Sequence, residues 1–225
     1  MDATLHVLKV FVGEDDRGGN PLGVFLSGFG LLGGVRQAIA ADLGFSETVF
    51  VENHAEGVLR IHTPTVELPL AGHPLVGTSW LMAHQGIPVD TLRPPAGEVP
   101  TWQTEGLTWI RAQPDWAPDF ELRQLADPDE VDAHPGAGPD ELLDVWAWED
   151  EEAGLVRSRV FPTAVGVVED EATGSAALRL GALLRRPLGI RQGIGSFIAA
   201  QVGPEGTVDI GGLTEIVEIR AYPLP

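Results

Sequence analysis

Residues 73–84 read His-Pro-Leu-Val-Gly-Thr-Ser-Trp-Leu-Met-Ala-His, and this stretch decides the fold. Nearly every face of the helix that it predicts is apolar, and Pro74 suits the first turn of a helix. A helix that is apolar on all sides is normally buried rather than placed on a surface. The sequence therefore predicts a central helix with other elements packed around it.

A second largely apolar helix is predicted about half a chain further on, at residues 174–184. A third helix is predicted at residues 35–43, with Gly44 as its C-terminal stop. Runs rich in β-branched and aromatic residues predict short strands around these helices. The strands are expected at residues 5–12, 22–26, 47–51, 57–62, 108–111, 143–148, 156–161, 196–202, 207–210 and 215–220.

The two apolar helices give the chain a repeated plan. Gly72-His73 and Gly174-Ser175 each place a glycine and a polar residue at the start of an apolar helix. We expect an α/β (α+β) protein with two pseudo-symmetric halves, each a curved, mostly antiparallel sheet wrapped around its own helix. A proline-rich connection divides the chain into residues 1–98 and 99–225, with the last strand free to return to the first half. Both helix starts would face a cleft between the halves.

The composition excludes several classes of function. With 33 acidic and 14 basic residues, the net charge of −19 disfavours binding to nucleic acid and to anionic membrane surfaces. The absence of cysteine excludes disulfides, thiolate metal sites and thiol bases. The six histidines form no pair with metal-ligand spacing, so no metal site is predicted. No apolar run is long enough to span a bilayer and no secretory signal is evident, so the cytoplasm is the expected location.

Glu47 is the first candidate for chemistry, because it follows a predicted helix and starts an otherwise apolar strand. On composition alone, a solvated glutamate at a sheet edge is the more common situation. The functional alternative is a general acid/base whose pKa is raised by apolar surroundings. Asn20 lies in the segment Gly18–Leu22, which is either a simple turn or part of the same site.

His73 stands at the start of the first buried helix, directly after Gly72. It is either a cap or satisfied core residue, or a proton donor at a helix N-terminus whose free N–H groups attract an anion. Asp170 precedes the second buried helix, where acidic residues commonly serve as helix caps. Its functional alternative depends on Gly174 and Ser175, because a glycine there permits close approach of a carboxylate to backbone N–H groups.

In order along the chain, these segments resemble the signature blocks of the PhzF-like family of phenazine biosynthesis. The matching blocks are residues 19–25, 46–51, 63–64 with 67–74, and 169–170 with 172–176. The resemblance extends from the first strand to Gly211-Gly212 and implies a diaminopimelate-epimerase-like fold. It also implies a cofactor-independent isomerase, because the name-giving member of the family isomerises trans-2,3-dihydro-3-hydroxyanthranilate without a cofactor.

By this resemblance, Glu47 takes the place of the family's acid/base carboxylate, and His73 and Asp170 match its other polar active-site side chains. The positions that bind substrate would be Asn20, Gly72, Gly174 and Ser175. A small anionic substrate and a homodimer are the partners that the resemblance suggests. Since the chain has no thiol, the two-cysteine mechanism of the related epimerases is excluded.

The chain also departs from the family pattern. It is shorter than typical members, Glu171 stands where a proline is usual, and the late Gln-Gly block is contracted to residues 192–196. These differences affect the shape of the pocket and therefore the identity of the substrate. Two alternatives remain open: another reaction or another unsaturated acid within secondary metabolism, and a non-catalytic protein that binds a small acid.

Overall fold

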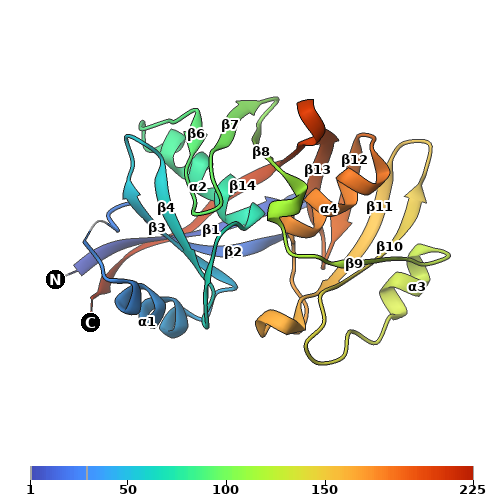
Figure 1. The fold of residues 1–225 in the computed structure, drawn as a ribbon, viewed down its shortest axis with the longest axis horizontal. Coiled ribbons are helices and arrows are strands. Elements are labelled where there is room, and N and C mark those ends of the chain that lie inside the picture. Colours follow the sequence, from blue (N-terminus) through green and yellow to red (C-terminus); the bar gives the residue numbers. More distant parts are fainter. Residues whose placement is uncertain (1, 29, 225) are drawn as a thin grey trace.

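The computed structural model of the chain describes residues 2–28 and 30–224. Within these residues, fourteen strands belong to one curved sheet, and two helices lie in its hollows (Figure 1). The first part contains β1 (Asp2–Val12), β2 (Gly18–Phe25), α1 (Gly33–Leu43), β3 (Glu47–Asn53), β4 (Val58–His62), β5 (Glu67–Leu68) and α2 (Gly72–His84). The middle contains β6 (Thr91–Leu92), β7 (Val99–Thr104) and β8 (Leu107–Ala112).

The remaining elements form the second half of the molecule. They are β9 (Glu121–Gln124), α3 (Pro128–Ala133), β10 (Leu143–Asp150), β11 (Leu155–Phe161), α4 (Gly174–Leu184), β12 (Leu188–Gln192), β13 (Ser196–Val202) and β14 (Val208–Pro223). Short 3₁₀ turns occupy Glu14–Asp16, Pro114–Trp116, Thr163–Val165 and Pro204–Gly206. None of the helices among the described residues is long and apolar enough to cross a bilayer.

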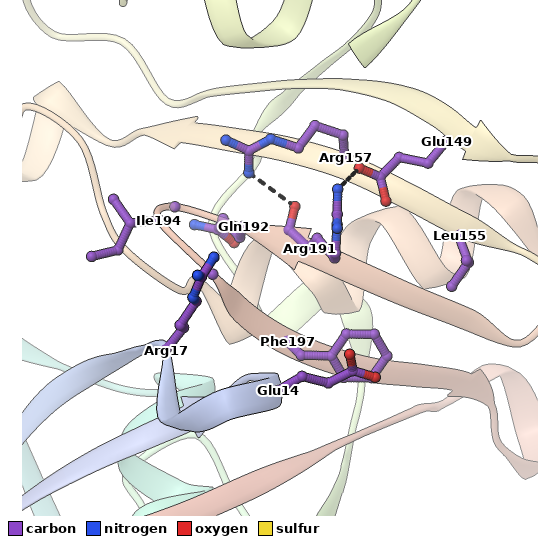
Figure 2. Close-up of a pocket in the computed structure, with 11 residues that line it drawn as sticks. Glu14, Arg17, Glu149, Leu155, Arg157, Arg191, Gln192, Ile194 and Phe197 are labelled. Atoms are coloured by element: carbon purple, nitrogen blue, oxygen red, sulfur yellow. Dashed lines mark hydrogen bonds and ion pairs between the residues drawn. The ribbon is translucent and has the colours of Figure 1, made fainter. Parts of the chain in front are cut away.

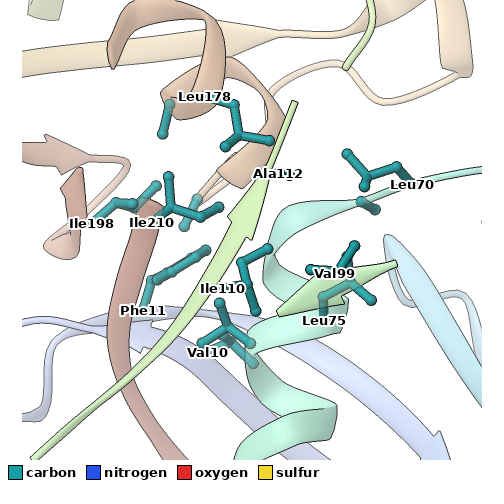
Figure 3. Close-up of a cluster of buried hydrophobic side chains, with 14 of the residues drawn as sticks. Val10, Phe11, Leu70, Leu75, Val99, Ile110, Ala112, Leu178, Ile198 and Ile210 are labelled. Carbon is teal, nitrogen blue, oxygen red and sulfur yellow. The ribbon is translucent and has the colours of Figure 1, made fainter. Parts of the chain in front are cut away.

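Helix α2 is buried along almost its whole length, as its apolar sequence predicts. Leu75 packs into a cluster with Val10 of β1, Val99 of β7 and Ile110 of β8 (Figure 3). At Gly77 the helix touches the sheet, because an added Cβ would lie 2.6 Å from Val10 Cγ2. The residues after position 98 therefore supply part of the wall around α2, and the division at residues 98 and 99 stays a prediction.

Helix α4 is buried on one side only. Leu178 and Leu180 pack in the same core as Ile198 of β13 and Val208 of β14. On its other side, Arg179 donates hydrogen bonds to the carbonyl groups of Ala117 and Pro118, at 2.7 and 3.0 Å. Helix α4 is thus held by strands β13 and β14 and by the segment after β8 that contains Ala117 and Pro118.

The two halves pair their strands in the same order. In the first half the pairs β1–β2, β2–β3 and β3–β4 are antiparallel, parallel and antiparallel. In the second half β10–β11, β11–β12 and β12–β13 repeat that order. The repeat and the two central helices agree with the predicted fold class.

Strand β14 joins the two halves into one sheet. Its residues from Leu213 onward pair with β1, whereas Val208–Gly212 pair with β13 and β8. Both chain ends consequently lie at the same end of the molecule (Figure 1).

Five strands and one helix are not predicted from the sequence, namely β5, β6, β7, β9, β12 and α3. Strand β7 begins beside Pro100, which hides its β pattern, and it pairs with β8. Helix α3 lies in an Asp- and Pro-rich stretch between the strands expected at residues 108–111 and 143–148, where no element is predicted. Its side-chain cap is Asp127, which accepts a hydrogen bond from the Glu130 N–H, and Pro128 opens its first turn. That cap and proline are a helix-start signal that the sequence analysis overlooked.

Candidate active site

Glu47 and His73, both from the first half, meet next to the contact between the starts of the two central helices. Glu47 is the first residue of β3, and its side chain is only 14% exposed. His73 lies in the first turn of α2 with 3% of its side chain exposed, and its Nε2 is 3.4 Å from Glu47 Oε2. Neither of these two buried atoms has a hydrogen-bond partner within normal distance. The two polar groups are therefore close to each other, but these two atoms have no hydrogen-bond partner.

Burial determines the protonation of this pair. It raises the pKa of Glu47 to about 8, and the nearby charge of Asp170 acts in the same direction, while the neighbouring Ser46 hydroxyl group acts in the opposite direction. Burial lowers the pKa of His73 to about 3. At neutral pH, Glu47 consequently keeps its proton and His73 is uncharged, so their 3.4 Å contact is not an ion pair. Glu47 is poised to exchange a proton near neutral pH.

Asn20 connects the two halves of the site. It lies near the start of β2, is buried, and donates from Nδ2 to Asp170 Oδ1 at 2.7 Å and to the Ala172 carbonyl at 2.9 Å. The same nitrogen lies 3.4 Å from His73 Nδ1. Its Oδ1 accepts a hydrogen bond from Ser46 Oγ at 3.1 Å. Asn20 therefore touches the neighbour of Glu47, the histidine and the aspartate at once.

Asp170 is buried and fully hydrogen-bonded. Thr173 Oγ1 donates to its Oδ2 at 2.6 Å, and Asn20 occupies its Oδ1. Gln192 Nε2 donates to the Asp170 carbonyl at 2.8 Å and to Thr173 Oγ1 at 2.9 Å. Burial raises the pKa of Asp170 to about 6, although the hydrogen bonds from Thr173 and Asn20 favour the charged form. Its position is fixed more firmly than that of Glu47.

The two central helices begin against each other. A Cβ added to Gly72 would lie 2.6 Å from the Gly174 Cα, and one added to Gly174 would lie 2.7 Å from the Gly72 Cα. No side chain caps either helix, because Ala71 and Thr173 make no cap hydrogen bond. The first-turn N–H groups of both helices thus lack the side-chain acceptors that usually satisfy them. Ser175 is half-buried in the first turn of α4.

A cavity of about 520 Å³ lies beside this cluster, between the turn after β1 and the sheet of the second half (Figure 2). Arg17 reaches from that turn toward the loop that carries Gln192 and Ile194. Arg191 of β12 pairs with Glu149 of β10 on the side of the cavity formed by this sheet. Of the residues that bond the cluster, Gln192 lines this cavity, and the predicted catalytic residues do not. The cavity is a neighbour of the cluster rather than its interior.

The structure brings Glu47, His73, Asp170 and Asn20 into one cluster, and it packs Gly72 against Gly174. Their roles in binding and catalysis stay predictions. Sequence reasoning missed the polar side chains that hold the cluster in place, which are Ser46, Thr173 and Gln192. Ser46 and Thr173 lie inside the quoted blocks, so their position next to candidate residues was the available signal. Gln192 lies 22 positions after Asp170 and gave no local signal. Among residues 2–28 and 30–224, no group of three or more His, Asp or Glu side chains could hold a metal ion.

Comparison with known proteins adds the family. A family model described as phenazine biosynthesis-like protein matches residues 9–108. The trans-2,3-dihydro-3-hydroxyanthranilate isomerase of Pseudomonas chlororaphis is 30% identical in an alignment 223 positions long. This alignment covers 75% of this chain and 75% of that protein. The chain belongs to the PhzF-like family.

Other PhzF-like relatives agree with this assignment. An uncharacterized isomerase of Pasteurella multocida is 45% identical over 84 residues, which cover 36% of this chain and 29% of that protein. The crystal structure of a PhzF family protein from Enterococcus faecalis matches with a TM-score of 0.79 at 22% identity, covering all of both chains. That match confirms the predicted fold. The prediction of an isomerase is confirmed, since the relatives from Pasteurella multocida and Pseudomonas chlororaphis both bear isomerase names.

Proposed function

We propose that the chain is a cofactor-independent isomerase that moves a proton within a small unsaturated carboxylic acid. The observation that supports this most directly is the buried Glu47 carboxyl group, whose pKa is raised to about 8 beside an uncharged His73. A group that exchanges its proton near the working pH is the most effective general acid/base. The substrate of the Pseudomonas chlororaphis relative, trans-2,3-dihydro-3-hydroxyanthranilate, is the reference compound for this proposal.

The proposed reaction needs one proton-carrying group. The Glu47 carboxylate removes a proton from an activated carbon, and the electron pair left behind shifts along the conjugated system. The resulting carboxylic acid then returns the proton, or one exchanged from solvent, to another carbon. No atom is gained or lost, so the product is an isomer and Glu47 is regenerated. One positioned general base contributes about 10²–10⁴-fold, and orientation in the cluster has to supply much of the rest.

His73 and Asp170 have different parts in this proposal. His73 Nε2, at 3.4 Å from Glu47 Oε2, accepts a hydrogen bond from the protonated carboxyl group when the two approach more closely. Asp170 fixes Asn20, whose nitrogen lies 3.4 Å from His73 Nδ1. The imidazole is thus held between the two parts of the site. Through these contacts the two side chains orient the Glu47 carboxyl group for the proton transfer.

The substrate carboxylate would bind where the two central helices begin. At these helix starts the N–H groups of Gly72, His73, Gly174 and Ser175 have no side-chain cap, and the helix dipoles favour an anion there. Local donors of this kind offset the repulsion from the net charge of −19. We expect Ser175, which is half-buried in the same turn, to contribute a further donor.

Solvent-deuterium incorporation tests the proposed function. The enzyme in heavy water is given trans-2,3-dihydro-3-hydroxyanthranilate and a panel of other unsaturated carboxylic and imino acids, and the products are followed by NMR. We expect isomerisation of at least one compound, with deuterium at the carbon that receives the proton. Glu47→Gln should abolish this reaction. Its matched control is Glu67→Gln, which removes a carboxylate of β5 whose side chain is 38% exposed.

Two results would contradict the proposal. One is a compound that raises the melting temperature of the protein but is recovered from heavy water chemically unchanged and without deuterium. That result would indicate a binding protein. Cleavage of a bond without formation of an isomer would indicate a different reaction in the same fold.

A further inference from the structure

Glu171, the residue after Asp170, holds a loop of the second half. Its two carboxylate oxygens accept hydrogen bonds from the Ile194 N–H at 3.0 and 3.1 Å, and Ser196 Oγ donates to its Oε1 at 2.7 Å. The loop is wrapped closely around this carboxylate, because a Cβ added to Gly193 would lie 2.1 Å from Glu171 Oε2. The residues between β12 and β13 are therefore tied directly to the chain segment of Asp170.

Ser196 connects Glu171 to the first half of the molecule. Its Oγ accepts a hydrogen bond from the Gly19 N–H at 2.8 Å while it donates to Glu171. The approach is close, since a Cβ added to Gly18 would lie 2.3 Å from the Ser196 nitrogen. Gly18 and Gly19 have φ values of +65° and +86°, which glycine adopts without strain. The turn before β2 is thus shaped to receive the serine.

The chain of contacts closes on the catalytic cluster. Gly19 precedes Asn20, and Asn20 Nδ2 donates to Asp170 Oδ1 at 2.7 Å. Asp170 in turn precedes Glu171. Two peptide segments and three hydrogen bonds, Asn20–Asp170, Gly19–Ser196 and Ser196–Glu171, form a ring that crosses between the halves.

We infer that Glu171 is a positioning residue, whose carboxylate holds Ser196 and Gly19 in place and so keeps Asn20 and Asp170 in bonding contact across the two halves. This inference rests on the proposed function for its kinetic consequence. Hydrogen bonds to a carboxylate are stronger than those between neutral groups, which suits Glu171 to this task. A displacement of about 1 Å in such a cluster can cost about 10²-fold in rate.

A pair of variants on either side of Asp170 tests the inference. Glu171→Ala removes the acceptor for Ser196 and Ile194, and we expect kcat to fall by about 10-fold or more with a small change in KM. Glu169→Ala is the matched control, because Glu169 also forms a two-pronged contact, with Arg159 at 2.7 and 2.8 Å, but outside the ring. The control should keep the parent's kcat.

Two further variants separate positioning from a general loss of structure. Glu171→Gln keeps one acceptor oxygen and should recover part of the kcat lost in Glu171→Ala. Ser196→Ala interrupts the same ring, so the double variant with Glu171→Ala should lose little more than either single variant. Fully additive losses, or a loss confined to KM, would overturn the inference.

A measurement without substrate keeps this test independent of the proposed function. Proton exchange of the Asn20 side-chain amide with solvent, followed by NMR, should accelerate in Glu171→Ala and in Ser196→Ala but not in Glu169→Ala. Unchanged exchange in the first two variants would overturn the positioning role. An enzyme that isomerises none of the test compounds but shows this acceleration would refute the proposed reaction and leave the positioning role supported.

Discussion

The two halves of the molecule each contribute a buried carboxyl group to one cluster, and they bond it in different ways. Glu47, from the first half, has a buried oxygen that lies 3.4 Å from His73 Nε2 and makes no hydrogen bond. Asp170, from the second half, has both oxygens bonded, at 2.7 Å from Asn20 and 2.6 Å from Thr173. Burial alone would raise the pKa of both groups.

The difference in bonding explains why the two groups suit different tasks. Hydrogen bonds that stabilise the charged form hold the pKa of Asp170 to about 6, whereas that of Glu47 rises to about 8. A carboxyl oxygen without a hydrogen bond can give up or accept a proton without breaking other contacts. A carboxyl group with both oxygens hydrogen-bonded can do so only by losing a hydrogen bond. This difference is the basis for proposing proton transfer by Glu47 and orientation by Asp170.

The largest expected effect comes from Glu47→Gln. The amide keeps the shape of the side chain but carries no transferable proton, so kcat/KM for the proposed substrate should fall by about 10²–10⁴-fold. Activity and the free energy of unfolding are measured together, and the latter should not decrease, because an ionisable group is removed from a buried position. A Glu47→Gln enzyme that isomerises as fast as the parent would reverse the assignment of the two carboxyl groups.

Asp170→Asn should have a smaller effect, about 10–100-fold on kcat, because it disturbs orientation and leaves the proton-carrying group intact. It also has a pH signature. If Glu47 must lose its proton to act as base, kcat/KM of the parent enzyme rises as the pH increases toward about 8. The charge of Asp170 contributes to the raised pKa of Glu47, so in Asp170→Asn the rise should move to lower pH.

The control for this variant is Asp144→Asn. Asp144 is equally buried in β10, with Ser158 Oγ donating to it at 2.6 Å, and burial raises its pKa to about 7. None of its hydrogen bonds reaches the cluster among the described residues. A shift of the pH profile in Asp144→Asn equal to that in Asp170→Asn would show that the effect is not specific to the cluster.

The smallest effect is expected on stability, from Gly72→Ala. The new Cβ would meet the backbone of Gly174 at 2.6 Å, so the two helix starts would be pushed apart at a cost of about 1–3 kcal/mol. Gly34→Ala, in α1 with no atom within 4 Å of the added Cβ, should be neutral or stabilise the protein by up to about 1 kcal/mol. Urea unfolding measures both. Equal stability of the two variants would show that the helix starts are not in tight contact.

Much of the fold could be predicted because the deciding signals are local. The apolar stretch at residues 73–84 became α2 (Gly72–His84), and the helix expected at residues 35–43 became α1 (Gly33–Leu43). Gly44 ends α1 with φ +68°, as expected of a C-terminal stop. The local sequence marked Glu47, His73 and Asp170 only as candidates, and the order of the four blocks that resemble the family selected them.

The rest depends on contacts between residues far apart in the chain. Nothing near Gln192 shows that it bonds Asp170 and Thr173, because these pairs arise only when β12 is in place beside the loop before α4. In the sequence, Glu171 was notable only because it stands where a proline is usual in the family. Its hydrogen bonds to Ile194 and Ser196 depend on how a contracted loop folds back. Sequence patterns predict which helices and strands form. Which side chains form hydrogen bonds with each other depends on how these elements pack together.

Strand β14 also limits how the molecule can move. Because one uninterrupted strand pairs with β1 on one stretch and with β13 and β8 on the other, the halves share a single spine. At the changeover, Gly211 lies against the ring of Trp109 and Gly212 against Phe11, with no room for a side chain at either position. Because this strand is continuous, we expect relative motion of the two halves to bend or twist β14 rather than to slide one half past the other.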